Sequence, residues 1–595
     1  MSEPVRPRSK GDVPDDPLSR LRHSASHVMA DAVQRLRPKA KVTIGPAIEN
    51  GFYYDFDTEP FAPEDIERIE AEMAKIIAQD LPFVRKVISR QDAVDLFTKK
   101  GETFKVEIIE GIPEGEEISL FQHGDFVDLC AGPHVERTGE IKAFKVLSFA
   151  GAYWRGDESK AQLQRVYGTA FSSKDDLKAH LERIEEAKRR DHRVLGKQLD
   201  LFSVDELVGP GFVLWHPKGA IVRGVLETFM RRELVGRGYH QVYTPHVARE
   251  QLLIKSGHMQ HYKDNLFGGM ELEGQRYLVK PMNCPFHVAI YRSQMRSYRE
   301  LPIRYAEFGT VYRYERSGVL HGLMRVRGFT QDDAHLFIRE DQIESEMNAC
   351  VHFGLDVLRI FGFEEVKLFL ATRPKDFMGE AAAWDHAEAA IRRVLESTGM
   401  PFEVDEGGGA FYGPKIDLKI RDAIGREWQC TTFQLDYQMP ERFEMEYVAS
   451  DGSRKRPVMI HRALLGSIER FIAVLIEHFA GAFPMWLSPV QARVISVSEK
   501  AEAYAREVES VLLGAGLRAD ADLSADKLNA KIRHAQLEKI PYMLVVGERD
   551  MAARVVSPRT RDGKQLPATA LDEIAQTLAA EAAVPQLGQA SLKPA

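Results

Sequence analysis

The clearest alternation of polar and apolar positions lies in the stretch Tyr305–Ile338, which predicts two strands joined by a glycine-containing loop, Ser317–Leu323. Because successive side chains point to opposite faces of a strand, residues two apart share a face. One face of the first strand would carry Arg313 and Glu315. The same alternation gathers on one face of the second strand Arg325, Arg327, Phe329, Gln331, Asp333 and His335.

This face has an unusual composition for a strand surface in contact with water. Solvated faces carry mostly Lys, Glu and Thr, whereas arginine forks suit phosphate or carboxylate groups and Phe329 offers a stacking surface. The opposite face of the second strand is smaller or more apolar. The pattern predicts a ligand-binding face, with an ordinary polar sheet face as the competing interpretation.

Helical periodicity organises the N-terminal third of the chain. A polar tail is expected over residues 1–17, and a first helix over 18–36. Amphipathic spacing predicts a second helix over Glu64–Ala78. Ser173 is placed to cap a long charged helix, Lys174–Lys197, which suits an exposed connector between domains. We therefore predict the first domain boundary there.

The middle of the chain mixes strands with helices such as Ala220–Gly236. A strand is expected to end at Pro245, and a late helix is expected with the apolar face Leu464, Leu465, Ile468, Phe471, Ile472 and Leu475. After Pro484 and Pro489 the predicted order becomes strand, helix, strand, helix, strand, strand, helix. That order is typical of a compact α/β domain with a mainly parallel sheet.

Two spaced pairs of histidine and cysteine could form a second site. His23 and His27 are four apart and so are neighbours on one helix face, while Cys130 and His134 flank a Gly-Pro turn. Together they would suffice for a zinc ion or a catalytic cluster if the fold joined them. Two histidines on a helix are more often ordinary surface or core residues, and that interpretation stays open.

Composition indicates the size class and the cellular compartment of the protein, but it says little about the reaction. The chain has 595 residues with 80 Lys+Arg against 88 Asp+Glu, so it is long enough for several domains and has no bulk basic character. Its four cysteines lie far apart, and no apolar run resembles a signal peptide or spans a bilayer. We expect a cytoplasmic protein without membrane contact. Because neither GxxxxGK[ST] nor a strand-linked GxGxxG occurs, any nucleotide phosphates would be held by arginines on a sheet.

Several longer motifs resemble one known family. They are KPMNCP, LHGLMRVRGFTQDDAH, AFYGPKID, MIHRALLGSIERF, HSASH, DLCAGPH, AGAYWRGD and QRVYGTAF. In order and spacing, from about Leu18 to about Leu578, the chain is similar to bacterial threonyl-tRNA synthetases, which are class II aminoacyl-tRNA synthetases. By this resemblance the first class II signature ends at Pro245, the second contains Arg313–Glu315, and the third ends at Arg470.

The resemblance implies an α/β and α+β multidomain fold. Its centre would be the class II antiparallel sheet flanked by helices, preceded by an α+β editing domain and followed by an α/β anticodon-binding domain. The implied bounds are 1–17 tail, 18–172 editing domain, 173–199 linker helix, 200–486 catalytic domain, 487–584 anticodon-binding domain and 585–595 disordered tail. The usual ubiquitin-like module ahead of the editing domain is missing from the pattern.

The implied reaction joins L-threonine to tRNA(Thr) through a threonyl-adenylate, at the expense of ATP held with Mg²⁺. Such transfer depends on positioning and charge stabilisation. The resemblance assigns Arg313 to the amino-acid carboxylate and α-phosphate, and Arg325 and Arg470 to the other phosphates. A surface salt bridge is the competing interpretation for each arginine. The remaining ATP residues by resemblance are Glu315 on the adenine amino group, Phe329 under the ring, and Gln429.

The resemblance also implies one zinc ion per subunit, bound by Cys284, His335 and His461, which would take the amino and hydroxyl groups of threonine. The threonine pocket would be completed by Gln331, Asp333, Tyr412, Thr432 and Gln434. His258 resembles a family histidine that lies near the reacting ribose and assists proton removal. Serine keeps the hydroxyl group and differs from threonine by one methyl group, which gives only about 1–3 kcal/mol of discrimination, so a second, editing site is needed.

By the same resemblance, the editing site hydrolyses seryl-tRNA and comprises His23, His27, Lys105, Asp128, Cys130 and His134, with no metal assigned. Asp550 and Arg559 are the candidates for reading anticodon bases, with ordinary surface charge as the competing interpretation.

The chain departs from the family at Phe286, where glycine is usual, and at Ala131, where arginine is common. Homodimerisation is expected from the class.

Two functions of other classes compete with this interpretation. A non-catalytic RNA-binding paralogue should have lost an arginine or a zinc ligand, and all of them are present. An AMP-forming ligase with a non-RNA acceptor would have no use for the editing and anticodon-like regions.

Overall fold

The computed structural model describes residues 16–157 and 159–587, and the chain divides into two compact units, Met1–Glu185 and Glu186–Ala595. The expected N-terminal tail lies outside the described residues except at its end. There the prediction is wrong, because Asp16 caps helix α1 (Pro17–Leu36) by accepting from the backbone of Leu18 and Ser19. Each unit is described by itself below.

The first unit is built on a five-stranded antiparallel sheet against which α1 and α2 (Pro63–Ala78) pack. Helix α1 is buried continuously from Leu21 to Val33, so its polar residues face the protein interior. The sheet strands are β1 (Lys41–Val42), β2 (Ala47–Ile48), β3 (Gly51–Asp57), β7 (Ala143–Tyr153) and β8 (Gln162–Phe171).

A smaller antiparallel sheet with two helices completes this unit. Its helices α3 (Arg90–Lys100) and α4 (Thr103–Glu110) pack on each other, and Phe97, Ile109 and Leu120 form its core. The strands are β4 (Val84–Ile88), β5 (Ile118–His123) and β6 (Phe126–Leu129). The unit is therefore α+β, as predicted.

The connector is two helices and not the single predicted one. Ser173 does cap α5 (Lys174–Arg190), since its Oγ accepts from the Asp176 N–H at 3.1 Å. The chain breaks at Asp191, whose non-helical backbone and side chain start a new helix, α6 (His192–Gln198). Local capping at Asp191 therefore overrides the continuous charged pattern.

The second unit centres on an eight-stranded sheet in the order β11-β16-β17-β24-β21-β20-β18-β19. The six central strands pair antiparallel, and only the edge pairs β11/β16 and β18/β19 are parallel. The bounds are β11 (His240–Gln241), β16 (Ile303–Tyr312), β17 (Gly328–Ile338), β18 (Val366–Ala371), β19 (Phe402–Asp405), β20 (Lys415–Arg421), β21 (Glu427–Asp436) and β24 (Val458–Ser467). This is the predicted antiparallel sheet flanked by helices.

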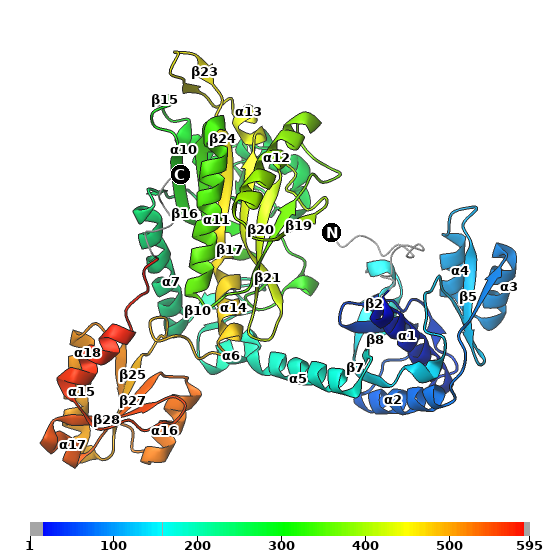
Figure 1. Ribbon diagram of the computed structural model, residues 1–595, viewed down its shortest axis with the longest axis horizontal. Helices are drawn as coiled ribbons and strands as arrows, with labels where there is room; N and C mark the ends of the chain where they lie inside the picture. Colours follow the sequence, from blue (N-terminus) through cyan, green and yellow to red (C-terminus); the bar gives the residue numbers. More distant parts are fainter. Residues whose placement is uncertain (1–15, 158, 588–595) are drawn as a thin grey trace. The chain divides into compact units, whose positions relative to one another are not determined.

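Helices bury one face of this sheet. Helix α11 packs on β21 and β24, α12 packs on α11 and β18, and α14 packs on β17 and β24 (Figure 1). Their shared core includes Phe229 of α7, Phe361 and Phe471. The bounds are α7 (Pro217–Gly236), α11 (Ile343–Ile360), α12 (Ala381–Ser397) and α14 (Ile468–His478).

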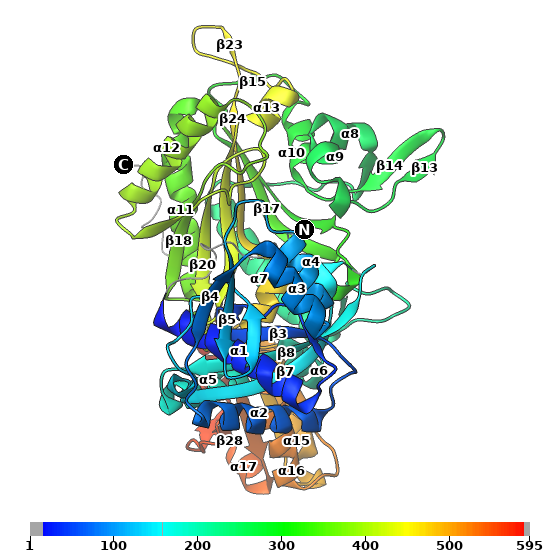
Figure 2. The same cartoon turned by 90° about the vertical axis from the view of Figure 1, so that its right-hand side faces the viewer.

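The remaining elements between the connector and the C-terminal part are short. Figure 2 shows α8, α9 and α10 grouped beside the hairpin of β13 and β14. Their bounds are α8 (Glu250–Lys255), α9 (His258–His261), α10 (Cys284–Tyr291), β12 (Val247–Arg249), β13 (Met270–Leu272) and β14 (Gln275–Val279). Further pieces are β9 (Phe202–Ser203), β10 (Leu214–Trp215), β15 (Arg296–Ser297), α13 (Gln438–Arg442), β22 (Tyr447–Val448) and β23 (Arg454–Lys455).

Two local predictions are wrong in this unit. Strand β16 ends at Tyr312 and β17 begins at Gly328. Four residues predicted on strand faces therefore lie in the connecting loop instead: Arg313, Glu315, Arg325 and Arg327. Leu464 and Leu465 belong to β24, because α14 begins only at Ile468. In both places the strand and the segment that follows it have similar apolar or charged residues. Local periodicity therefore does not locate the end of the strand.

The C-terminal part is the predicted mainly parallel α/β domain. Strand β25 pairs parallel with β26 and β27, and β28 joins antiparallel. Helix α17 (Glu548–Ala553) was not predicted. The other bounds are β25 (Ala492–Ser496), α15 (Glu502–Gly514), β26 (Ala519–Asp522), α16 (Leu528–Leu537), β27 (Tyr542–Val546), β28 (Val555–Thr560), β29 (Thr569–Ala570) and α18 (Leu571–Glu581).

The predicted disordered C-terminal tail covers residues 585–595, and the structure describes only the first three of them. The Pro585 carbonyl accepts from Arg232, and Leu587 packs against the core of the large sheet, so the prediction is wrong for 585–587. Residues 588–595 lie outside the described part. Within 16–157 and 159–587, no helix has the length and apolar character needed to cross a bilayer.

Candidate active site and a second histidine–cysteine site

The predicted polar face of β17 exists along the strand itself. Thr330, Asp332 and Ala334 are buried on one side, while Phe329, Gln331 and Asp333 stand half-buried on the other. Hydrogen-bond register then sets the neighbours: His335 on β17 pairs with His461 on β24, which pairs with Gln434 on β21. The register brings together side chains that no local pattern could group.

Cys284, His335 and His461 form a buried triad at this register position. One donor atom of each lies within 4.8 Å of the others, and the three side chains come from α10, β17 and β24. The His335 Nε2 and His461 Nδ1 atoms are 3.1 Å apart. A thiol and two imidazoles are the donor set that zinc prefers.

Outer partners fix which ring nitrogens face one another. The His461 Nε2–H donates to Asp436 Oδ2 at 2.8 Å, so its Nδ1 is bare. The Glu307 carboxylate accepts from His287 Nε2 at 3.2 Å, and His287 Nδ1 then accepts from His335 Nδ1 at 2.8 Å. His335 Nε2 is consequently bare as well. Two facing lone pairs need a cation between them, and this fits a metal ion.

Burial of the triad also favours a bound cation, through its effect on the pKa values of Cys284 and His335. Burial raises the pKa of the Cys284 thiol well above its ordinary value, with Asp333 and Asp436 adding to the effect. Burial also lowers the pKa of His335 well below its ordinary value. The imidazole is therefore neutral and ready to bind a metal, whereas a thiolate here requires a cation to stabilise it.

The predicted threonine residues line the sheet next to this triad. Asn283 Nδ2 donates to Asp333 Oδ2 at 3.0 Å, and burial raises the pKa of Asp333. Asn283 reaches β16 closely because Gly309 has no side chain: a Cβ there would lie 2.4 Å from the amide oxygen. Asn283 was not predicted.

An aromatic side chain borders the triad on the β21 side. The Tyr412 ring stacks on His461 with 4.8 Å between centroids, and its hydroxyl donates to Gln434 Oε1. Gln434 Nε2 in turn donates to Thr432 Oγ1 at 3.4 Å. Tyr412, Thr432 and Gln434 therefore form one hydrogen-bonded group beside the metal ligands.

His258 is buried against the triad. Its Nε2 lies 2.8 Å from the Met282 sulfur and 4.0 Å from the Cys284 sulfur, and its Nδ1 lies 2.7 Å from Ser256 Oγ. Burial, with His461 and Arg313 nearby, lowers the pKa of His258 to about 3. A neutral imidazole in this position can accept a proton but is a weak base.

The predicted nucleotide residues lie in or beside the loop between β16 and β17. The Arg313 guanidinium lies 5.1 Å from the centroid of the Phe329 ring, and its Nε donates to the Pro281 carbonyl at 3.3 Å. Arg325 pairs with the Glu315 carboxylate at 2.9 Å. Gln429 is exposed on β21. Arg313 is thus held against the ring of Phe329 and the Pro281 carbonyl, whereas Arg325 is held by a carboxylate of the same loop.

Arg470 reaches this loop from the first turn of α14. Its Nε donates to the Met324 carbonyl at 3.1 Å, and its side chain is exposed. The strand-to-helix junction before it is held by the buried Asp332 carboxylate, which accepts three backbone N–H groups, each at 2.9 Å, from Leu464, Leu465 and Gly466.

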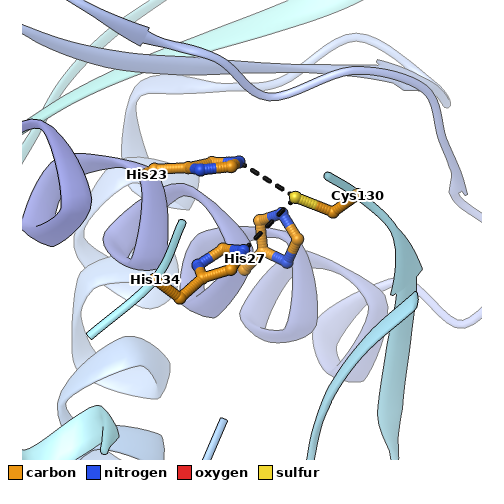
Figure 3. A group of neighbouring side chains, drawn as sticks. All are labelled: His23, His27, Cys130 and His134. Atoms are coloured by element: carbon orange, nitrogen blue, oxygen red, sulfur yellow. Dashed lines mark hydrogen bonds between the residues drawn. The ribbon is translucent and has the colours of Figure 1, made fainter. Parts of the chain in front are cut away.

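The four residues of the second site do come together in the first unit. In Figure 3 the rings of His23 and His134 converge on the sulfur of Cys130, each at 3.3 Å, beside His27. Helix α1 supplies His23 and His27, and the segment after β6 supplies the other two. The fold therefore brings the two pairs together, which was the condition for a site formed by these four residues.

Hydrogen bonds orient the rings of His23 and His134 so that the Nε2 atom of each faces the Cys130 sulfur. His23 Nδ1 donates to the Pro133 carbonyl at 3.1 Å, and His134 Nδ1 lies 3.0 Å from Ser24 Oγ. Burial lowers the pKa of His27 and His134 well below the ordinary value and raises that of Cys130 to about 12. The set can accept protons or hold a water molecule, and its donor types could also hold a metal.

A buried acid and base stand beside this cluster. The Lys105 ammonium pairs with the Asp128 carboxylate, which also accepts the Tyr54 hydroxyl at 2.6 Å and lies 3.6 Å from His27 Nε2. All are buried. Tyr54 was not predicted, because a tyrosine within the apolar run FYYDF gives no local signal of its polar partner.

Asp550 and Arg559 occupy unlike positions in the C-terminal domain. Asp550 accepts from the Gly547 N–H at 2.9 Å and from Ser557 Oγ at 3.0 Å, so its carboxylate already caps α17. Arg559 lies on β28 and donates to Gln565 Oε1 at 3.2 Å.

The two sequence departures have different surroundings. Phe286 is buried in α10 with the Lys280 ammonium 5.6 Å from the centroid of its ring. Ala131 is exposed next to Cys130.

Three family models match the chain. A "tRNA synthetase class II core domain (G, H, P, S and T)" covers residues 269–479, an "Anticodon binding domain" covers 491–581, and a "Threonyl and Alanyl tRNA synthetase second additional domain" covers 118–167. Each lies on a part whose fold was described above.

Curated relatives and solved structures agree with these models. A threonine–tRNA ligase of Acidithiobacillus ferrooxidans is 54% identical over 564 residues, which are 95% of this chain and 88% of the relative. That of Nitrosococcus oceani is 54% identical over 96% and 88%. The RNA binding domain of a threonyl-tRNA synthetase from Cryptosporidium parvum covers 67% of this chain and 99% of its own, with 42% identity and a TM-score of 0.64.

Proposed function

The chain belongs to the threonine–tRNA ligase family, and from that premise we propose how its residues divide the work of ligation and editing. The enzyme joins threonine to tRNA with ATP, and its second additional domain serves the editing of mischarged tRNA. The class II core, the editing domain and the anticodon-binding domain are all present.

Cys284, His335 and His461 would hold a zinc ion. Support comes from the donor set, from the facing bare nitrogens and from the outer partners Asp436 and His287. Three protein ligands leave room for substrate atoms, and when bound the metal supplies a Lewis acid for the threonine amino and hydroxyl groups.

This arrangement accounts for discrimination against valine. Valine is nearly isosteric with threonine but has no hydroxyl group, so the polar groups Asp333, Gln331 and Tyr412 would remain unmatched. Sites built to bind a substrate hydroxyl reject the analogue that lacks it far better than an apolar pocket can. Thr432 and Gln434 fix the position of Tyr412 through the hydrogen bonds described above.

The arginines of the loop and of α14 bind ATP, which enters with Mg²⁺. Arg313 lies over Phe329 and near Pro281, between the sheet face and the loop, where it can bridge the amino-acid carboxylate and the α-phosphate. Arg325 and Arg470 hold the other phosphates, Glu315 reads adenine, and Gln429 lies alongside. In this structure Arg325 pairs with Glu315, so nucleotide binding has to exchange that ion pair for contacts to ATP.

We assign to His258 the role of proton acceptor near the reacting ribose hydroxyl during transfer to tRNA. Its neutral state and position beside Cys284 support the assignment. Its low pKa makes it an orienting acceptor more than a strong base.

Serine retains the hydroxyl, so it must be removed afterwards by hydrolysis of seryl-tRNA at the second site. His23, His27, Cys130 and His134, with Asp128 and Lys105, are the residues proposed for it. Bare imidazole nitrogens can accept a proton from water, and the paired Lys105 and Asp128 set the local charge.

The proposed domain bounds are 18–172, 200–486 and 487–584, and the family matches fall within them. From the family we also propose a homodimer that acts in the cytoplasm. Its tRNA(Thr) would be recognised through Asp550 or Arg559. Arg559 is the better of the two anticodon candidates, because Asp550 is already occupied as a helix cap.

One observation carries the ligase assignment at this site: the register that joins His335, His461 and Gln434 beside the loop of Arg313. Threonine-dependent pyrophosphate exchange by the purified protein tests it. Arg313→Ala should reduce exchange by at least about 100-fold, since one preorganised charge contact is worth about 3 kcal/mol in the transition state. Arg359→Ala, on the exposed side of α11, is the matched control. No exchange by the unmutated protein would refute the assignment.

A further inference from the structure

A buried histidine at the start of α6 connects two elements that carry ATP residues. We propose that His192 is a positioning residue that holds the loop bearing Arg325 in place for ATP. This inference rests on the proposed role of that loop in binding phosphates. His192 is not among the residues that the family motifs assign.

Two partners fix the tautomer of His192, whose side chain is fully buried. Its Nε2 accepts the backbone N–H of Leu323 at 3.1 Å. A backbone N–H can only donate, so Nε2 carries no proton, and Nδ1–H donates to Glu477 Oε1 at 2.6 Å. The His192 backbone N–H donates to the same oxygen at 3.1 Å.

The contact with Leu323 lies in a tight turn of the loop. Met324 N–H and Arg325 N–H both donate to the His321 carbonyl, at 2.9 and 3.2 Å. His192 therefore fixes the residue two positions before Arg325. The Met324 carbonyl is held from the other side by Arg470 Nε at 3.1 Å.

Close packing makes this turn specific to the histidine. Gly322 has a φ of +48°, and a Cβ there would lie 2.2 Å from His192 Nε2. The loop backbone thus approaches the imidazole more closely than a side chain would permit. Leu323 and Met324 are themselves buried, so the turn is anchored although Arg325 is exposed.

Glu477 connects the same histidine to the helix that carries Arg470. It lies near the end of α14, and its second oxygen pairs with Arg426 at 2.5 Å. Burial would raise the pKa of Glu477, but the hydrogen bonds from His192 together with the charge of Arg426 lower it. A charged acceptor therefore holds the Nδ1 proton and keeps Nε2 available for Leu323.

A metal site is the alternative for this cluster, since Asp191, His192 and Glu477 have donor atoms close together. The donors are already engaged, however. His192 Nε2 binds Leu323, and both Asp191 carboxylate oxygens accept from Arg193, at 3.0 and 2.6 Å. The cluster is a hydrogen-bonded brace.

Two amide substitutions separate the two contacts of the ring. His192→Asn can keep a donor at the Nδ1 position but loses the acceptor for Leu323, whereas His192→Gln can keep that acceptor. We expect His192→Asn to raise the KM for ATP in pyrophosphate exchange by about tenfold, the worth of one buried hydrogen bond. His192→Gln should stay within about threefold, and the KM for threonine should not change in either variant.

The controls separate positioning from folding and from the role of the loop. His386→Asn, an exposed histidine of α12, is the matched substitution. A purely structural role would lower kcat equally in both His192 variants without a selective rise in the KM for ATP, and that result would overturn the proposal. If Arg325→Ala leaves the KM for ATP unchanged, the phosphate role of the loop fails, and with it this inference.

A measurement on the unmutated protein covers the case in which His192→Asn does not fold. Hydrogen exchange of the Leu323 amide should be slow without ATP, because the N–H is already bonded to His192. Exchange as fast as that of the exposed loop residue Gly318 would overturn the proposal. Slow exchange that becomes fast in His192→Asn but stays slow in His192→Gln is the expected result.

Discussion

Replacing Asp436 by asparagine is expected to weaken zinc binding without removing a ligand. The side chain is fully buried at the end of β21, and both oxygens are used. Oδ2 accepts the His461 Nε2–H at 2.8 Å, and Oδ1 accepts the backbone N–H groups of Gln438 and Met439 at 2.7 and 3.0 Å. An amide has one oxygen, so its NH₂ must face one of these donors.

The magnitude follows from what the substitution does to the ring. If the amide NH₂ faces His461, the ring proton moves to Nδ1 and blocks the proposed metal-binding atom. If it faces the Gln438 and Met439 amides, the first two backbone N–H groups of α13 lose their acceptor. Loss of such an outer partner costs about 10- to 100-fold in metal affinity, or about 1.4–2.8 kcal/mol.

Zinc affinity can be measured by competition with a chromophoric chelator, together with metal content after dialysis. Asp451→Asn is the matched control, because Asp451 is exposed and bonds only its own turn through Ser453. Cys284→Ser should lose zinc altogether and sets the lower limit. An affinity of Asp436→Asn within threefold of the unmutated protein, with an unchanged melting temperature, would refute the reasoning.

Three further predictions concern the first unit. His27→Ala should leave threonylation intact while seryl-tRNA accumulates, and unchanged clearance of seryl-tRNA would show that the cluster is misassigned. Because burial depresses the pKa of His27 and His134, the unfolded state binds more protons below pH 6.5, the ordinary value. The unit should therefore lose stability as the pH falls from about 6.5, and His27→Ala should show a shallower loss in thermal melts. Lys105→Met should destabilise the unit by about 3–5 kcal/mol in denaturant unfolding, since it leaves the Asp128 charge buried and unpaired, whereas the exposed Lys100→Met should not.

Local sequence was sufficient for much of the architecture. Amphipathic spacing located α2 within one residue of its predicted start, and the order of strands and helices after Pro489 identified the mainly parallel domain. Local sequence failed to predict the ends of elements where these depend on capping or on tertiary pairing. Asp191 splits the connector into α5 and α6, and β24 continues through Leu464 and Leu465, which helical spacing alone had placed in α14.

The sequence by itself determined the family, through motif strings such as KPMNCP and HSASH, and with the family the reaction. Only the tertiary structure placed His335 opposite His461, moved Arg313 and Arg325 from strand faces into a loop, and joined His192 to Leu323. The physical reason is that strand register and hydrogen bonds between distant segments depend on the whole packed sheet. Side-chain periodicity records only which face of its own element a residue occupies.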